Sequence, residues 1–332
     1  MHDLVIKGAE VADGSGAPLR IADVAVSDGR VTEVGRVDGA AKQSVDGSGL
    51  VLSPGIVDVH THYDAQLTWD SNATPSPALG VTTVVVGNCG FSIAPCPPEC
   101  RDLIARNLAE VEGMSLTALR SGTNWEFESF AEYLTLLKRK GVTPNVAAFI
   151  GHSAVRTMVM GDEASARAAN DDEVAAMRDL VAGGMDAGAV GFSTSTSINH
   201  YGDGGVPMPS RLAEESELRS LVGVLGEKKR GVFQLTVGPS MTSEVMESIA
   251  ADNNCPVFQT AALHNEAFPE RAHMMVSDSA DAQARGNQLW AQVSCQPLSM
   301  DFALTAAFPM QSLDSWRPLI DADNESFERQ IR

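Results

Sequence analysis

The sequence predicts an α/β protein in which an incomplete TIM-like (β/α) barrel follows a small N-terminal β unit. Up to residue 52, short strands are separated by glycine-rich turns. From residue 53 onward, apolar strands alternate with helical stretches, which is the pattern of a parallel sheet or barrel. Several of these strands end on a histidine or a cysteine, the position at which such barrels carry functional side chains.

The first unit is expected over residues 1–52 and the barrel domain over residues 53–332. Short runs typical of strands lie in the first unit at 3–7, 22–26, 31–34 and 50–52. Such short strands bury little surface, so we expect this sheet to have only a small core of its own.

The barrel domain is expected to hold strands at 56–61, 82–88, 145–151, 189–194, 232–237, 256–263 and 289–295. Apolar residues at helical spacing predict helices between them, at 130–140, 171–187, 214–229 and 242–251. The clearest of these helices opens at Asp171 with acidic residues and carries Val174, Met177 and Leu180 on one face. The region therefore repeats strand and helix, as a parallel barrel does.

The barrel is expected to be incomplete. A closed barrel of this type has eight strands in about 250 residues. Here a long excursion at 89–144 occupies part of the domain, and the segment after residue 296 holds no further convincing strand. We interpret the chain as a partial one, with an open sheet of seven strands as the alternative.

The composition argues against a protein that binds nucleic acid or a membrane. The 332 residues carry a net charge of −19, whereas nucleic acids and anionic membranes need a basic face. No apolar stretch has the length of a membrane span, and the first residues lack the features of a signal peptide. The five cysteines are scattered and odd in number, so no disulfide framework is expected. We expect a cytoplasmic protein.

His60-Thr61-His62, at the end of the apolar run 55–59, is the most informative motif. Side chains two residues apart on a strand point to the same side, so His60 and His62 can bind one metal ion, with Asp58 beside them. The alternative is a pair of ordinary core or surface imidazoles. The preceding Pro-Gly and the nearby aspartate favour a metal.

Three other expected strands end on residues that can bind a metal. These residues are Cys89 in Gly-Asn-Cys-Gly, His152 in Gly-His-Ser, and His264. A hydrolytic metal centre needs such donors to converge from several strand ends, with one position left for water. Cys89 could instead be a small buried apolar residue. His152, four residues before Arg156, is expected to contact the substrate or a metal ligand.

The loop 191–197 is rich in serine and threonine, but it lacks the Gly-Lys-Ser/Thr ending of a phosphate-binding loop. Ser193 is not part of a Gly-x-Ser-x-Gly nucleophile motif either. We expect Ser193 to line a polar, substrate-binding pocket. His200, in the following glycine-rich segment, is equally compatible with a solvated position.

At these residues the chain resembles the amidohydrolase superfamily, and within it the N-acyl-D-amino-acid deacylase (D-aminoacylase) group. The resemblance spans about two-thirds of the chain and rests on 54–64, 80–92, 151–156 and 188–194. It implies a metal-dependent TIM-like barrel, with residues 1–52 forming part of a small β-sandwich. It also implies hydrolysis of the amide bond of N-acyl-D-amino acids or related N-acyl compounds, small-molecule substrates, by zinc-activated water.

The resemblance assigns the metal ligands residue by residue. His60, His62 and Cys89 match the His-x-His pair and the cysteine that hold one or two zinc ions in the family. The family's histidine on the fifth strand has no counterpart in 232–237, and the nearest match to its sixth-strand histidine is His264, three residues late. We expect His264 as the further ligand, with His152, Arg156 and Ser193 contacting the substrate.

The family's catalytic aspartate follows the eighth strand, which this sequence lacks. We therefore expect this chain alone to be nearly inactive, with a missing C-terminal segment or a split partner chain. Two alternatives stay open. A cyclic-amide hydrolase of the same superfamily would need a metal-bridging lysine on its fourth strand, where none is found. A non-catalytic, degenerate scaffold would bind no zinc.

Overall fold

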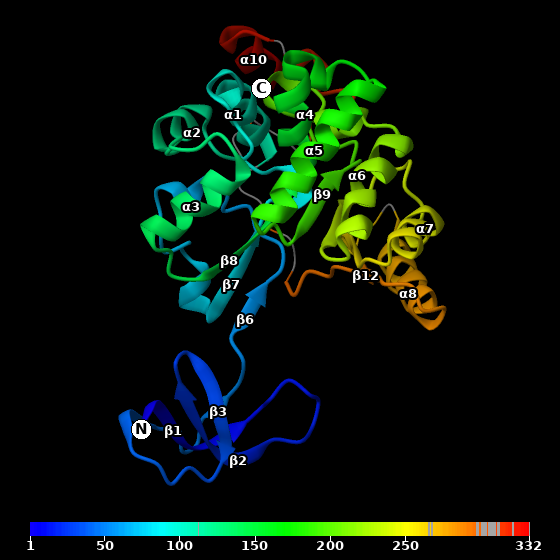
Figure 1. Cartoon of the computed structure of the whole chain (residues 1–332). Helices are drawn as coiled ribbons and strands as arrows, with labels where there is room; N and C mark the ends of the chain where they lie inside the picture. Colours follow the sequence, from blue (N-terminus) through cyan, green and yellow to red (C-terminus); the bar gives the residue numbers. More distant parts are fainter. Residues whose placement is uncertain are drawn as a thin grey trace. The chain divides into compact units, whose positions relative to one another are not determined.

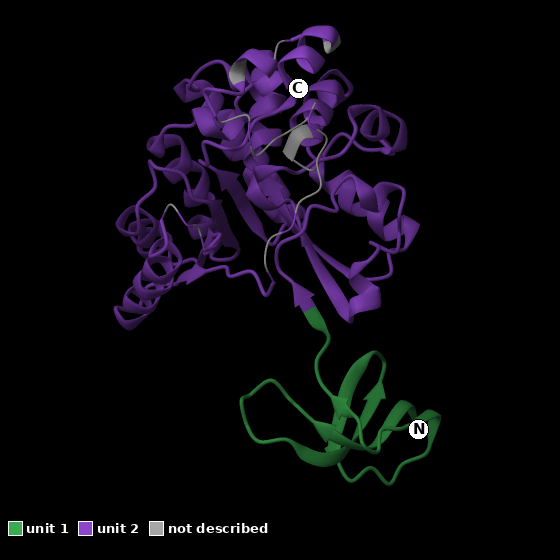
Figure 2. Ribbon diagram, turned by 180° about the vertical axis from the view of Figure 1, so that it is seen from behind, with its two compact units in different colours: residues 1–56 green, residues 57–332 purple. Residues whose placement is uncertain are grey.

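The structure, a computed structural model, describes residues 1–111, 113–264, 266, 268–296, 299, 304, 310, 313–320 and 322–331. The chain divides into two compact units, residues 1–56 and 57–332 (Figure 2). Among the described residues, none of the helices combines the length and the apolar character that a bilayer crossing requires.

The first unit is a five-stranded sheet, in which β3, β2, β1 and β4 are neighbours in that order and β5 also pairs with β1. Its strands are β1 (His2–Val11), β2 (Arg20–Ser27), β3 (Arg30–Gly35), β4 (Ala41–Asp46) and β5 (Val51–Leu52). β4 was not among the strands expected from the sequence. Its residues are mostly exposed and polar, and it is held by parallel pairing with β1. The buried apolar residues form two small clusters, as expected of so thin a sheet.

The second unit is built around a seven-stranded sheet in the order β12-β11-β10-β9-β8-β7-β6 (Figure 1). All neighbouring pairs from β7 to β12 are parallel. The strands are β6 (Ile56–Asp58), β7 (Val81–Val86), β8 (Asn145–Gly151), β9 (Gly191–Ser195), β10 (Val232–Thr236), β11 (Val257–Thr260) and β12 (Leu289–Ala291). This confirms the expected barrel architecture, and each of the seven expected strands is present. The strands expected at 56–61, 256–263 and 289–295 end earlier, at Asp58, Thr260 and Ala291. In the described part of the chain, β6 and β12 are the edges of the sheet.

Helices α4 to α8 pack in chain order, each against the next. The helices are α1 (Arg101–Val111), α2 (Leu116–Gly122), α3 (Phe130–Lys140), α4 (His152–Met160), α5 (Asp171–Ala187), α6 (Glu215–Lys228), α7 (Ser243–Asn253), α8 (Arg271–Ala284), α9 (Arg317–Ile320) and α10 (Asn324–Ile331). The excursion at 89–144 is thus largely helical. Helices α3 and α5 begin with complete capping boxes, at Ser129 and Asn170. The reciprocal hydrogen bonds of a capping box satisfy free backbone N–H groups of the first turn and so fix where each helix begins.

The main core lies between this sheet and its helices. All five residues of β9 are buried, so this strand is covered on both faces. Parallel strands covered on both faces are typical of barrel and doubly wound folds, in which the strands' carboxyl ends converge on a single functional face. The candidate site lies at these carboxyl ends.

Candidate metal centre

Three side chains from two strand ends meet in a cluster of metal-binding donors. His60 and His62 follow β6, and Cys89 follows β7. Their donor atoms all lie within 4.8 Å of one another. The Cys89 Sγ lies 3.2 Å from Nε2 of His60 and 3.7 Å from Nε2 of His62. Three donors of the kind that bind zinc therefore converge on one point.

The cysteine reaches this point because its loop has an unusual backbone. Gly87, Cys89 and Gly90 all have positive φ, of 78°, 58° and 79° respectively. A Cβ atom on Gly87 would lie only 2.4 Å from the carbonyl oxygen of Phe149, so only glycine fits there. A non-glycine residue at positive φ is uncommon and is concentrated at functional sites, which agrees with a ligand role for Cys89.

Hydrogen bonds join the two segments that carry the ligands. The Asn88 side chain donates to the carbonyl oxygens of Thr61 and Val85, at 3.2 and 2.9 Å. The Gly87 N–H donates to Oδ2 of Asp64 at 2.9 Å. Burial raises the pKa of Asp64 to about 6, against the opposing effects of the Gly87 N–H and of His62. These contacts fix the spacing between the His-x-His pair and the cysteine.

The facing wall of the site consists of amides and hydroxyls from β10, β11 and β12. Gln234 accepts a hydrogen bond from the Cys89 N–H at 2.7 Å and donates to Thr260 at 3.0 Å. The Thr236 hydroxyl donates to the Cys89 Sγ at 3.0 Å. Gln292 accepts from Thr260 and lies 3.0 Å from Nδ1 of His60. His60 and Cys89 thus each have a polar partner on this wall.

The geometry and the chemistry of the donors fit a zinc ion. Tetrahedral zinc with ordinary bond lengths places its nitrogen and sulfur ligands about 3.5 Å apart, close to the two separations found here. Burial lowers the pKa of His60, against the opposing effects of Gln292 and Asp58, so the imidazole is neutral near pH 7 and can bind a metal. Among the described residues, three protein donors converge, which is the number found in catalytic rather than structural zinc sites.

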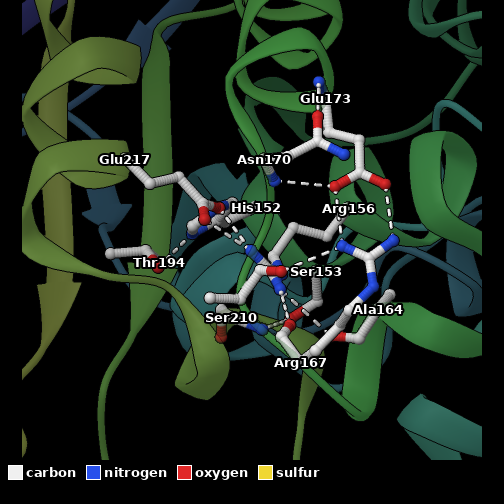
Figure 3. Close-up of polar contacts among 11 residues, drawn as sticks. His152, Ser153, Arg156, Ala164, Arg167, Asn170, Glu173, Thr194, Ser210 and Glu217 are labelled. Carbon is white, nitrogen blue, oxygen red and sulfur yellow. Dashed lines mark hydrogen bonds and ion pairs between the residues drawn. The ribbon is translucent and has the colours of Figure 1, made fainter.

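His152 and Arg156 lie in a buried ion cluster (Figure 3). His152 contacts the Thr194 hydroxyl through Nδ1 at 2.8 Å and Glu217 through Nε2 at 2.7 Å. Arg156 donates to both carboxylate oxygens of Glu217 at 2.6 Å, and its other end donates to the carbonyl oxygens of Ala164 and Arg167. The side chains of His152 and Arg156 have no exposed surface.

That His152 and Arg156 contact substrate stays a prediction. In the structure, both ring nitrogens of His152 have protein partners, and the Arg156 guanidinium is held by a carboxylate from α6. Burial lowers the pKa of His152, an effect opposed by Glu217. The contacts of this cluster join α4 to α6 and to the segment before α5.

The expected roles of Ser193 and His264 also stay predictions. Ser193 is fully buried, donates to the carbonyl oxygen of Gly87 and accepts from the Gly90 N–H, so in the structure it contacts the cysteine loop. β11 ends at Thr260, and His264, beyond it, is exposed. Among the described residues, neither His264 nor Asp58 belongs to the donor cluster.

Sequence reasoning missed several residues of the site. Glu217, Gln234 and Gln292 carry no motif, and their roles depend on partners distant in sequence. The sequence does not distinguish a site position from a solvated position for His200. In the structure its ring centroid lies 4.9 Å from that of Phe91. Burial lowers the pKa of His200 to about 3, and the charges of His62, Arg211 and His60 act in the same direction. The signal that could have identified it is its position just after a barrel strand.

Known proteins resemble this chain in sequence and in structure. A family model described as "Amidohydrolase family" matches residues 43–318. Over 197 residues the chain is 43% identical to a D-aminoacylase from Alcaligenes xylosoxydans xylosoxydans, covering 58% of this chain and 37% of that protein. The structure resembles a crystal structure of D-aminoacylase, with a TM-score of 0.72 and 29% identity, over 90% of this chain and 59% of that one.

A second solved structure is equally similar. It is an N-acyl-D-glutamate deacylase from Bordetella bronchiseptica, complexed with zinc and a phosphonate inhibitor that mimics the tetrahedral intermediate. The TM-score is 0.72 and the identity 27%, over 89% of this chain and 59% of that one. The chain thus spans 37% of the length of the curated D-aminoacylase and about 59% of each solved chain.

Proposed function

Because this chain belongs to the amidohydrolase family, we propose that the protein hydrolyses the amide bond of N-acyl-D-amino acids, using a metal held by His60, His62 and Cys89. The observation that carries this proposal is the convergence of three donors within 4.8 Å at the carboxyl ends of β6 and β7. The substrate class is taken from the D-aminoacylase and the N-acyl-D-glutamate deacylase that the chain resembles.

The metal is proposed to be zinc, in agreement with the zinc complex of the N-acyl-D-glutamate deacylase. Two imidazoles and a thiolate are preferred zinc ligands. When bound, zinc supplies a Lewis acid that polarises the scissile carbonyl and makes water nucleophilic near neutral pH.

One ion is proposed instead of two. A second metal would need further donors on the opposite wall, where β10 and β11 present Gln234, Thr236 and Thr260. Their neutral amide and hydroxyl groups bind zinc poorly and are already engaged with Cys89 and with one another. Among the described residues, the three donors form the only cluster of this kind.

The chain's own residues prepare the ligands. The positive-φ loop and a hydrogen bond from the Thr236 hydroxyl hold the Cys89 sulfur in place. The Gln292 amide oxygen accepts from Nδ1 of His60, which leaves the lone pair of Nε2 directed at the cluster. No carboxylate of the described residues joins the cluster, so the proton-transferring residue is left unassigned.

The test combines metal binding with ligand binding. Residues 1–332, freed of metal by a chelator, are titrated with Zn²⁺, and the zinc form is titrated with a phosphonate analogue of an N-acyl-D-glutamate. We expect one zinc per chain and binding of the phosphonate only when zinc is present. The same protein is also incubated with N-acetyl-D-amino acids, their L enantiomers and hydantoin, and free amine is measured.

Two results would contradict the proposal. A chain that binds no zinc would support the non-catalytic scaffold. Hydrolysis of hydantoin without hydrolysis of N-acetyl-D-amino acids would support the cyclic-amide hydrolase. Cys89→Ser, which removes one donor, serves as the control in which zinc and phosphonate binding should both be lost.

A further inference from the structure

A hydrogen-bond relay connects the backbone of Cys89 to the imidazole of His60 by way of three neighbouring strands. The Cys89 N–H donates to Oε1 of Gln234 on β10 at 2.7 Å, and Nε2 of Gln234 donates to the Thr260 hydroxyl on β11 at 3.0 Å. The Thr260 hydroxyl donates to Oε1 of Gln292, directly after β12, and this oxygen lies 3.0 Å from Nδ1 of His60. Two proposed metal ligands are thus joined through three side chains that are not themselves in the donor cluster.

The middle of the relay lies on one face of the sheet and is shielded from water. Gln234 and Thr236 are two residues apart on β10 and so point to the same side. Thr260 is in register with Thr236 on the neighbouring strand. Gln259, one residue earlier, points the other way and donates to α8. Gln234 is fully buried and Thr260 nearly so, so water does not compete for these hydrogen bonds.

The direction of each hydrogen bond follows from atoms that have only one role. A backbone N–H only donates, so the amide oxygen of Gln234 faces Cys89 and the NH₂ group faces Thr260. An NH₂ group also only donates, so the Thr260 oxygen accepts from it and directs its own hydrogen to Gln292. The atom of Gln292 at that point is the carbonyl oxygen, which only accepts. Nδ1 of His60 is therefore a donor, and the lone pair of the ring is on Nε2, 3.2 Å from the Cys89 Sγ.

Thr260 keeps the Gln292 amide in this orientation. Nε2 of Gln292 is buried without a hydrogen-bond partner among the described residues, so that end of the amide does not fix it. If the amide turned over, the Thr260 hydroxyl would lie between two NH₂ groups, and its buried hydrogen would lose its acceptor. The reversed amide would also donate to Nδ1 of His60. The ring proton would then move to Nε2, where metal binding needs a lone pair.

We propose that Gln234 and Thr260 are positioning residues of the metal centre, which hold His60 in its metal-binding tautomer by way of the Gln292 amide. This inference rests on the proposed function and extends it to residues that act through another side chain. The backbone N–H of one ligand, Cys89, thereby determines which nitrogen of a second ligand carries the proton.

Zinc affinity tests the role of Thr260. Thr260→Val keeps the shape of the side chain and removes the hydroxyl, so the Zn²⁺ affinity, measured by competition with a chromogenic chelator, should fall about 10-fold. Thr260→Ser restores a hydroxyl and should bind zinc within about threefold of the wild type. The matched control is Gln259→Met, which removes a buried amide on the same strand but outside the relay. It should also stay within about threefold of the wild type.

A double-mutant cycle separates an effect through Gln292 from an independent one. Gln292→Ala lacks the amide through which Thr260 acts, so adding Thr260→Val should lower the zinc affinity by less than about twofold. The control pair combines Gln292→Ala with Thr236→Val, which removes the hydroxyl that contacts the Cys89 sulfur directly. In that pair the two losses of affinity should multiply.

The tautomer of His60 is measured in the metal-free protein. Long-range nitrogen–proton NMR correlation spectra distinguish the two tautomers, and comparison with His60→Asn assigns the signals. In the wild type we expect the proton on Nδ1. Thr260→Val should shift the population toward the Nε2–H tautomer, which a loss of packing alone would not do. Gln234→Met, which contacts His60 only through the relay, should cause the same shift and covers the case in which Thr260→Val does not fold.

Three results would overturn the inference. Wild-type zinc affinity in Thr260→Val would show that the metal centre does not depend on this hydroxyl. Losses that multiply when Thr260→Val is added to Gln292→Ala would show that Thr260 acts by another route. A ring proton on Nε2 in the metal-free wild type would reverse the direction of the relay. Absence of zinc binding by the wild type would instead refute the proposed function, and the tautomer of His60 would still test the relay.

Discussion

Nδ1 of His60 lies 3.0 Å from Oε1 of Gln292, although 232 residues separate them in the sequence. The two residues follow β6 and β12, the two edge strands of the described seven-stranded sheet. The sheet is therefore curled so far that the carboxyl ends of its edges come within reach of one hydrogen bond. This contact also orients the imidazole, because a donor at Nδ1 leaves the Nε2 lone pair for a metal.

Gln292→Ala should weaken zinc binding, because it removes this contact together with the hydrogen bond from Thr260. The variant removes the partner of His60 without removing a ligand, and partners of this kind contribute about 10- to 100-fold to metal affinity. The matched control is Gln288→Ala, an exposed glutamine just before the other end of β12, which should bind zinc like the wild type. Competition with a chelator measures the affinities. Equal affinity in Gln292→Ala and the wild type would show that His60 needs no such partner.

Cys89→Ser should lose more zinc affinity than Gln292→Ala, at least about 100-fold, because it removes a ligand instead of a supporting partner. With Co²⁺ in place of zinc, the wild type should show a sulfur-to-cobalt charge-transfer band that this variant lacks. Cys295→Ser, which changes an exposed cysteine, is the control and should keep the band. A band that persists in Cys89→Ser would mean that another thiol binds the metal.

The three proposed ligands could be singled out from the sequence because their signals are local. His60 and His62 are two residues apart directly after a short apolar strand, and glycines on both sides of Cys89 mark a special loop. The seven strands were predictable for the same reason, since each is a short apolar run with turn residues beside it. β4 could not be predicted in this way, because its residues are mostly exposed and its pairing with β1 depends on tertiary structure.

The partners of the ligands could not be predicted, because they depend on contacts between distant elements. His152 and Arg156 follow a barrel strand, as substrate-binding residues do, yet both are buried and hydrogen-bonded to Glu217 on α6. Glu217 lies 61 residues after Arg156, at a position that the sequence marks only as helical. In the same way, Gln292 and His60 become neighbours only when the sheet curls.

Gly87→Ala should destabilise the protein and misplace the cysteine. Its φ of 78° disfavours any residue with a Cβ, and the added atom would lie 2.4 Å from the Phe149 carbonyl oxygen. We expect the free energy of unfolding to fall by about 3 kcal/mol or more. Gly183→Ala, in the exposed face of α5 with no atom near the new methyl group, should instead gain up to about 1 kcal/mol. Urea unfolding measures both, and similar values for the two variants would contradict this account of the loop.

Glu217→Gln should be strongly destabilising, because Arg156 then stays charged, buried and without a counter-ion. Breaking a buried ion pair from one side costs about 3–5 kcal/mol. The control is Glu227→Gln on the same helix, which removes an exposed partner of Arg178 and should cost about 0.5 kcal/mol or less. A small loss in Glu217→Gln, comparable with that of the control, would show that His152 and bound water can replace the carboxylate.

The stabilising effect of Glu217 should disappear in acid. Burial raises the pKa of Glu217, but the hydrogen bonds and charges of His152 and Arg156 outweigh this and lower the pKa to about 2, from an ordinary value of 4.5. A carboxyl whose pKa is lower in the folded state stabilises the fold above its unfolded pKa and loses that effect as the pH falls toward the folded one.

The difference in unfolding free energy between the wild type and Glu217→Gln should therefore be constant from pH 7 to about pH 5. It should then shrink by about 3 kcal/mol between pH 5 and pH 2, since each tenfold change in proton affinity is worth about 1.4 kcal/mol. Comparing the two proteins at each pH cancels the titrating groups that do not contact Glu217, including Asp64. Urea unfolding from pH 7 down to the lowest pH at which both proteins fold measures this difference, and a difference that grew as the pH fell would reverse the sign required by a carboxylate paired with Arg156.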